Sequence, residues 1–293
     1  MKISVSIGIP AYNEEKNIGR LLTAILNQKT YYVKIDQVVV ISSGSTDRTD
    51  MIVDDFVRKD SRIVLIKQRR REGKASAINE FLKVARNEVL VLESADTIPK
   101  EDAIEKLCRP FMDERIGMTG AHPIPTNNDN SFMGYVSHIV WQLHHLIALR
   151  VPKCGELIAF RKVFNSIPVD TIVDEAWIEY EILRRGYKIL YVPDAIVYNR
   201  GPETIRDYIK QRRRIACGHL GLVKRMKYKV STQRYILLIQ ALIKAFSKSQ
   251  LSKWPYFFGA ITLEVLSRIL GYYDYIRGKN HVIWDIAQTT KKV

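Results

Sequence analysis

One acidic residue, Asp96, follows a predicted strand whose apolar sequence indicates that it is buried. Asp96 follows the apolar run at residues 88–92, where a carboxylate serves little purpose unless it caps a turn or binds a cation. Mg²⁺ typically takes one or two protein carboxylates and completes its shell with water and substrate phosphates. Asp96 is therefore predicted to bind a divalent metal, with capping of the turn at residues 97–99 as the alternative.

Two adjacent acids, Asp174 and Glu175, come directly before a helical stretch at residues 176–185. Negative charge at a helix N-terminus is favourable by about 0.3–1 kcal/mol, which is the structural explanation. The functional explanation is a general base, which needs a carboxylate within hydrogen-bond reach of an acceptor hydroxyl. Both explanations stay open on position alone.

Two groups of cations could meet a phosphate. Lys74 follows Gly73, but no Walker loop is present, because Gln68 stands where that motif needs a glycine and Ala75 where it needs Ser or Thr. The sequence has no GxGxxG motif either. A second group is the basic run at residues 211–214, which a solvated helix face would explain equally well.

Alternating strands and helices must position these side chains. A doubly wound α/β sheet is expected, because short β-rich runs alternate with helical apolar spacing. The loops at residues 10–15, 42–47 and 94–97 then meet at the carboxyl edge of the sheet, where ligands bind. The predicted strands are residues 4–10, 38–41, 63–66, 88–92, 187–192 and 195–198; the predicted helices are residues 17–28, 49–59, 75–85 and 204–229.

Residues 130–149 contain no Asp, Glu, Lys or Arg, a length that could span a membrane. Ser137, His138, Gln142, His144 and His145 interrupt the run. A packed or interfacial helix is therefore favoured over a span.

Six short motifs, in type and order, resemble family 2 glycosyltransferases over residues 4–220. The layout is similar to the membrane-associated branch that includes cellulose and hyaluronan synthases, without its long transmembrane array. The motifs are Pro10-Ala11-Tyr12-Asn13-Glu14-Glu15, Ser42-Ser43-Gly44-Ser45-Thr46-Asp47, Gly73-Lys74, Ser94-Ala95-Asp96, Asp174-Glu175 and Gln211-Arg212-Arg213-Arg214.

The resemblance implies a GT-A fold, a nucleotide-diphosphate-sugar donor, a divalent metal (Mn²⁺ or Mg²⁺) and inversion at the anomeric carbon. UDP is the preferred nucleotide, and the acceptor would be a glycan or a lipid-linked hydroxyl. By the same resemblance, the nucleotide pocket would be formed by Pro10, Ala11, Tyr12, Glu14 and Asp47, and the base and pyrophosphate would lie along Gly73 and Lys74. The metal motif would be Ser94 and Asp96, and the general base would be Glu175 or Asp174. The diphosphate and the acceptor end would be held by Gln211, Arg212 and Arg214.

The chain departs from the family pattern in four places. Ser42-Ser43 replaces a common acid pair, which leaves the choice of nucleotide open, and Ser94 replaces the first acid of the metal motif. Asp174-Glu175 reverses the usual acid order, so the residue that takes the proton stays undecided. Ile215 stands where the family usually has Trp, which favours a short or lipid acceptor.

Positive charge is concentrated at the C-terminal end. The chain has 46 Lys and Arg against 31 Asp and Glu, and 18 of the basic but only 5 of the acidic residues fall within residues 201–293. Basic residues beside apolar, aromatic stretches at residues 235–246 and 254–276 are typical of helices lying on an anionic bilayer. We therefore expect a catalytic domain at residues 1–230 and an amphipathic helical segment at residues 231–293, attached peripherally to the inner face of the cell membrane.

Other readings of the chain are less favoured. A nucleic-acid-binding protein would need groove-reading or base-stacking elements, and no such motif appears, so no nucleic-acid partner is expected. A catalytically silent relative that still binds a nucleotide-sugar remains an alternative because of the three serine substitutions. Three widely spaced cysteines and no signal peptide favour a reducing, cytoplasmic setting.

Overall fold

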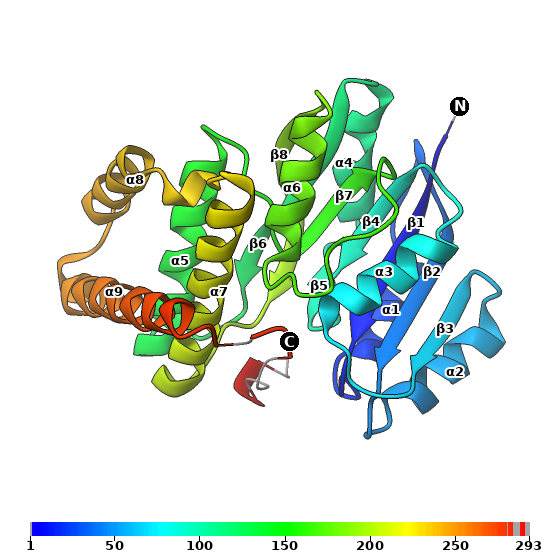
Figure 1. Cartoon of the computed structure of the whole chain (residues 1–293), viewed down its shortest axis with the longest axis horizontal. Coiled ribbons are helices and arrows are strands. Elements are labelled where there is room, and N and C mark those ends of the chain that lie inside the picture. The colour runs from blue at the N-terminus through cyan, green and yellow to red at the C-terminus, as the bar shows by residue number, and fades with distance from the viewer. Residues whose placement is uncertain (1, 280, 284–287, 291–293) are drawn as a thin grey trace.

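A central eight-stranded sheet organises the protein (Figure 1). The computed structural model describes residues 2–279, 281–283 and 288–290, so parts of the predicted C-terminal segment lie outside the described residues. The strands are β1 (Ile3–Ala11), β2 (Val33–Ser43), β3 (Ile63–Gln68), β4 (Val89–Glu93), β5 (Thr97–Pro99), β6 (Ile116–Pro125), β7 (Leu157–Arg161) and β8 (Lys188–Asn199). The helices are α1 (Ile18–Leu26), α2 (Thr49–Lys59), α3 (Lys74–Val84), α4 (Ala103–Cys108), α5 (Phe132–Ala148), α6 (Asp174–Arg184), α7 (Ile205–Met226), α8 (Tyr235–Ser247) and α9 (Trp254–Ile276).

The strand order is β3-β2-β1-β4-β7-β6-β8-β5. The first four strands in this order run parallel, and β7 then lies antiparallel to both β4 and β6. The prediction of a doubly wound α/β sheet is confirmed, and the sheet is mixed, because β7 lies between β4 and β6 and runs opposite to both. The two late strands expected at residues 187–192 and 195–198 form one continuous strand, β8.

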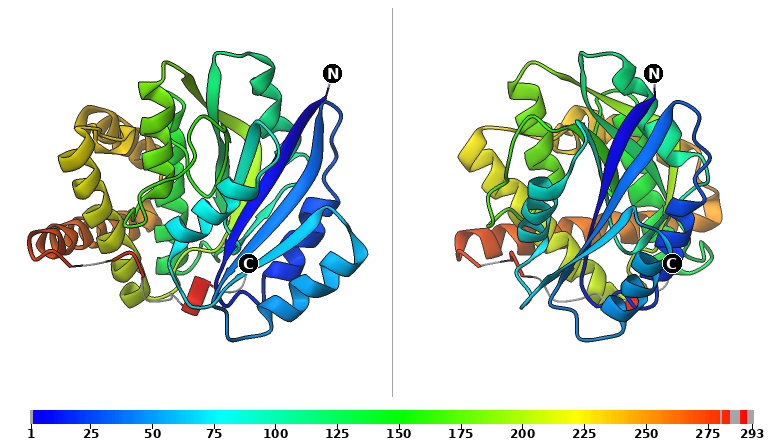
Figure 2. Two further views of the ribbon diagram at one scale, coloured as in Figure 1. Left: turned by 45° about the vertical axis from the view of Figure 1, so that its right-hand side comes forward. Right: turned by 90° about the vertical axis from the view of Figure 1, so that its right-hand side faces the viewer.

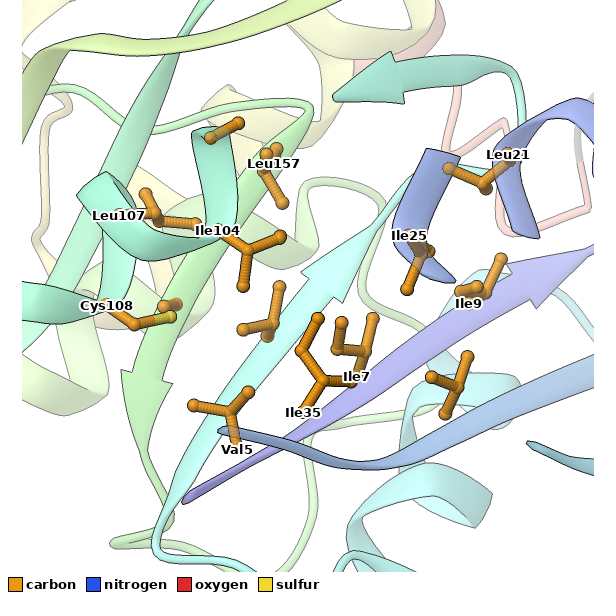
Figure 3. Close-up of a cluster of buried hydrophobic side chains, with 14 of the residues drawn as sticks. Val5, Ile7, Ile9, Leu21, Ile25, Ile35, Ile104, Leu107, Cys108 and Leu157 are labelled. Carbon is orange, nitrogen blue, oxygen red and sulfur yellow. The ribbon is translucent and has the colours of Figure 1, made fainter. Parts of the chain in front are cut away.

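Two apolar clusters hold helices to the two faces of the sheet. Val5, Ile7 and Ile9 of β1 point to one face, where they meet α1, α2 and α4 (Figure 3). The opposite face packs against α3 and α6. Gly8 is required here, because a Cβ at this position would lie 2.4 Å from the Phe81 ring of α3. The sheet is covered on both sides, as its continuous β-branched runs predict.

Helices α5, α7, α8 and α9 gather beside the sheet, away from the β3 edge (Figures 1 and 2). Their shared core includes Val136 of α5, Tyr208 of α7 and Leu263 of α9. Helix α5 covers most of the uncharged run at residues 130–149. It packs against α8 and α9, as the prediction of a packed helix rather than a membrane span expects. Among the described residues, no helix is both long enough and apolar enough to cross a membrane. The boundary expected at residue 230 stays a prediction.

Candidate active site

A cavity of about 1280 Å³ opens where the sheet meets the helical group. Its wall comes from the loops after β1, β3 and β4, from Ser43 at the end of β2, and from α3, α5, α6, α7, α8 and α9. The parallel strands bring three of these loops together, as their positions at the carboxyl edge predict. The predicted site residues that line this cavity are Pro10, Ala11, Tyr12, Glu14, Gly73, Lys74, Ser94, Asp96, Asp174, Glu175, Gln211, Arg212 and Arg214.

Asp47, which is expected to close the nucleotide pocket, lies outside the cavity lining. Its Oδ1 accepts hydrogen bonds from the Thr49 backbone N–H (3.0 Å) and from Thr49 Oγ1 (2.6 Å), at the start of α2. Its Oδ2 accepts a third from the Glu15 backbone N–H at 3.1 Å. Asp47 therefore joins the two loops and stabilises the start of α2, and its predicted contact with the nucleotide stays a prediction.

The Tyr12 ring and the Arg71 guanidinium form a flat, cationic wall. The Arg71 Cζ lies 4.1 Å from the centroid of the Tyr12 ring, and both residues line the cavity. Glu14 is fixed beside them, since its backbone N–H donates to Thr49 Oγ1 at 2.7 Å and its Oε2 accepts from Asn17 Nδ2 at 3.1 Å. A planar nucleobase stacks well on such a surface.

Lys74 is enclosed by the two predicted bases. Its Nζ lies 2.9 Å from Asp174 Oδ2 and 2.7 Å from Glu175 Oε1. Helix α3 begins at Lys74 and α6 begins at Asp174, so two helix N-termini place the three charges together. The resemblance expects Lys74 along the pyrophosphate, whereas its ammonium here neutralises the acids.

This arrangement separates the two acids electrostatically. Burial and the charge of Glu175 raise the pKa of Asp174 to about 6. For Glu175, burial is outweighed by the Lys74 charge and hydrogen bond, which lower its pKa to about 2. Glu175 is thus ionised at neutral pH, as a general base must be.

Asp96 has two oxygen-bearing neighbours in the cavity, Glu156 and Asn199. Glu156 adopts a left-handed backbone (φ 59°), and burial with the charges of Asp96 and Glu175 raises its pKa to about 7. Ser94 Oγ donates to the Glu156 carbonyl at 3.4 Å, so Ser94 supports the loop. Asn199 gave no signal in the sequence, because it ends a strand 103 residues beyond Asp96.

The residues present fit a hard divalent cation. Asn199 Oδ1 is buried without a hydrogen-bond partner, and it lines the same cavity as the Asp96 carboxylate. The described residues contain no cluster of three or more His, Cys, Asp and Glu that could enclose a metal ion by themselves. A magnesium or manganese ion would therefore depend on Asp96, neighbouring oxygen and the substrate's own phosphates.

The three consecutive arginines of α7, Arg212, Arg213 and Arg214, divide between structural and site roles. Arg212 binds Glu264 of α9 at 2.7 Å, and Arg213 binds Asp274 at 2.5 Å. Arg212 lines the cavity, and its guanidinium donates to Glu264; its predicted contact with the diphosphate stays a prediction. Arg214 faces the acids; burial lowers its pKa against the opposing charges of Asp174, Glu175, Glu156 and Asp96.

A protein-family model and several named proteins match the chain in sequence. A model described as "Glycosyl transferase family 2" matches residues 6–172, which is more than half of the chain. Poly-beta-1,6-N-acetyl-D-glucosamine synthase of Staphylococcus aureus (strain COL) is 26% identical over 252 residues, covering 80% of this chain and 60% of the relative. The same enzyme of Staphylococcus epidermidis is 26% identical over 256 residues, covering 81% and 61%. The chain thus spans about 60% of the length of these relatives.

Solved structures share the fold. A mannosyltransferase from Pyrobaculum calidifontis, in complex with GDP-Man and Mn²⁺, superposes with a TM-score of 0.68 at 21% identity, covering 95% of this chain and 88% of that one. TarS 1–349 of S. aureus in complex with UDP gives 0.51 at 17% identity, covering 99% and 95%. Glucosyl-3-phosphoglycerate synthase of Mycobacterium tuberculosis gives 0.51 at 16% identity, covering 78% and 82%. The expected GT-A fold is confirmed, and the chain belongs to glycosyl transferase family 2 and is a glycosyltransferase.

Proposed function

We propose that this glycosyltransferase moves a sugar from a nucleoside diphosphate sugar, with UDP preferred, to a hydroxyl acceptor on a glycan or a lipid-linked glycan. One observation carries the proposal: Asp96, the Lys74-bound acid pair and Arg214 meet in one cavity below the Tyr12–Arg71 surface. The relatives named for N-acetylglucosamine polymer synthesis support a glycan acceptor. The structural neighbours bound to UDP or GDP-Man support a nucleotide-sugar donor.

In the proposed reaction, the nucleobase stacks at Tyr12 and Arg71, and the diphosphate lies toward Asp96 and Arg214. Asp96 would hold Mn²⁺ or Mg²⁺, and the bound cation would neutralise the negative charge of the leaving diphosphate. Arg214 adds a fixed positive charge where negative charge develops on the leaving group. Such preorganised electrostatics is usually the largest catalytic contribution.

Glu175 is the proposed general base. Its carboxylate accepts the proton of the acceptor hydroxyl, whose oxygen forms the new bond to the anomeric carbon as the bond to the diphosphate breaks. Attack from the face opposite the leaving group inverts that carbon in a single displacement. Lys74 keeps Glu175 ionised before the proton moves.

Calorimetric titration of the purified protein with UDP, GDP and dTDP, each with and without Mn²⁺, tests the donor site. We expect UDP to bind at least about tenfold more tightly with Mn²⁺ than without it, a difference of about 1.4 kcal/mol. Asp96→Asn should abolish the metal effect while retaining the metal-independent affinity. Lack of binding by all three nucleotides would contradict the proposal; metal-dependent binding without any sugar transfer would identify a silent relative.

Peripheral attachment to the anionic inner face of the cell membrane is the second part of the proposal. Helices α8 and α9 expose apolar side chains at helical spacing, which gives each helix an apolar stripe facing away from the core. The exposed apolar residues of the two stripes that lie outside the cavity lining are Ile236, Ile239 and Ile243 on α8 and Phe258, Leu266, Ile269, Tyr273 and Ile276 on α9.

The charge around these stripes favours a bilayer as their occupant. Lys244, Lys248, Arg277 and Lys279 are exposed beside them. The two acids of α8 and α9, Glu264 and Asp274, instead turn inward to arginines of α7. Each surface cation adds about 1 kcal/mol of attraction to an anionic leaflet.

A further inference from the structure

One region of the cavity is used by none of the steps above. Trp141 and His144 lie three residues apart on the same face of α5 and both line the cavity. Their rings meet edge to face, with centroids 5.1 Å apart. A Cβ built on Gly155 would lie 3.9 Å from Trp141 Cη2 and 4.0 Å from His144 Nε2. The tips of both rings therefore reach the backbone next to Glu156.

His144 is a polar side chain without a protein partner. It is 9% exposed, and neither Nδ1 nor Nε2 has a hydrogen-bond partner among the described residues. Leaving a buried polar group unpaired costs about 1–3 kcal/mol, so such groups usually serve a ligand or water. Burial and the nearby Lys153 lower the pKa of His144 to about 3, so the ring is neutral. A neutral imidazole offers one donor and one acceptor, the same pair that a hydroxyl group offers.

This region shares the cavity with the proposed base. Lys153, Glu156, Glu175 and His219 line the same cavity as Trp141 and His144. Gly155 adds no side chain between the two rings and the chain leading to Glu156. A molecule resting on Trp141 and His144 therefore lies in the same cavity as the Glu175 carboxylate.

We infer that Trp141 and His144 form the subsite for the terminal sugar of a neutral glycan acceptor. This inference rests on the proposed function and names its acceptor class. The Trp141 ring covers the apolar C–H face of the sugar, and His144 exchanges hydrogen bonds with one of its hydroxyls. An aromatic wall with a few placed polar groups is the usual composition of a small-molecule site. Without a sugar these two residues would remain an unpaired imidazole beside a half-buried indole.

Isothermal titration with neutral oligosaccharides tests this subsite. The probes are the tetrasaccharides of β-1,6-linked N-acetylglucosamine, β-1,4-linked N-acetylglucosamine and α-1,2-linked mannose, added to protein saturated with UDP and Mn²⁺. We expect at least one to bind, and Trp141→Ala to weaken its affinity about tenfold. His144→Leu should weaken it similarly, whereas His144→Gln, which keeps a donor and an acceptor, should retain most of the affinity.

Two controls separate the subsite from folding and from the donor site. UDP–Mn²⁺ affinity should stay within error of the wild type in each variant, and each variant should keep a cooperative thermal transition. Tyr31→Ala removes an exposed aromatic ring outside the cavity, and saccharide binding should be unchanged. Binding of UDP–Mn²⁺ without binding of any saccharide, or equal saccharide affinity in wild type and Trp141→Ala, would overturn the subsite alone. Failure of UDP–Mn²⁺ binding in the wild type would instead overturn the proposed function.

Discussion

A single buried lysine determines which carboxylate can act as the base. Lys74 contacts both Asp174 and Glu175, yet the pKa falls for Glu175 and rises for Asp174. Two buried carboxylates side by side cannot both ionise easily without a cation. The lysine therefore keeps Glu175 ionised well below neutral pH, whereas Asp174 takes up a proton near pH 6.

Replacing this lysine should change the pH dependence of turnover. With a pKa of about 2, Glu175 stays ionised above pH 5, so wild-type kcat/KM should show no acid limb there arising from Glu175. Lys74→Met removes the cation that offsets the burial of the Glu175 carboxylate, so the pKa of Glu175 rises. The kcat/KM of this variant should therefore fall as the pH drops, with an acid limb at least about one pH unit higher than any acid limb of the wild type. Lys74→Arg keeps the cation and is the matched control.

The pH profile of kcat/KM from pH 4.5 to 9 makes this comparison. A wild-type acid limb near pH 6 would assign the base to Asp174, because its pKa is about 6. Identical profiles for the wild type and Lys74→Met would contradict the role given to Lys74.

At the scale of elements, the contact between α7 and α9 fixes the back wall of the cavity. Glu264 of α9 accepts hydrogen bonds from Tyr208, Arg212 and Arg268. The Glu264 side chain is 21% exposed, so solvent screens these contacts only partly.

Removing this carboxylate should loosen the helical group. Glu264→Ala leaves a partly buried guanidinium unpaired and should lower the free energy of unfolding by about 2 kcal/mol. Glu203→Ala breaks the exposed pair with Arg200 and should cost less than about 1 kcal/mol. Urea denaturation of both variants measures the difference; equal losses would show that Glu264 contributes no more than a surface charge.

Local patterns predicted most elements, and non-local pairing explains what was missed. The predicted helices at residues 49–59 and 254–276 coincide with α2 and α9, because apolar spacing is a local signal. Strand β6 was not predicted, since it contains Gly117, Gly120, Pro123 and Pro125, and its pairing with β7 and β8 comes from distant segments.

The candidate site divides in the same way. The acids and Lys74 were identified because each begins or follows a regular element, and sheet topology brings those points together. The ion pair between Arg212 and Glu264 could not be predicted from the sequence, because 52 residues separate the two residues and the basic run also fits a diphosphate site. Glu264 is the single glutamate of residues 235–273, and its partner is set by the packing of α9 on α7, which the local sequence does not specify.

At the scale of the whole molecule, helices α8 and α9 lie at the end away from β3 (Figure 1), and both expose apolar side chains. Vesicles containing 30% phosphatidylglycerol should bind the protein at low salt, and neutral phosphatidylcholine vesicles should bind it less well. The double variant Ile239→Glu, Ile269→Glu removes apolar contact and adds negative charge, so its affinity should fall at least about tenfold.

Val169→Glu changes an exposed apolar residue outside the stripes and serves as the control. Co-sedimentation measures all three proteins. Equal binding of the wild type and the double variant, or no preference for anionic vesicles, would contradict membrane attachment through α8 and α9.

Sugar transfer itself tests the central claim most directly. Wild-type protein with Mn²⁺ and UDP-N-acetylglucosamine, UDP-glucose or GDP-mannose should release the nucleoside diphosphate from one donor, with inversion at the anomeric carbon observed by NMR. Asp96→Asn should reduce this turnover at least about 100-fold, the scale of losing a key electrostatic group. Absence of release from every donor, or unchanged turnover in Asp96→Asn, would contradict a transferase that works through the Asp96 cavity.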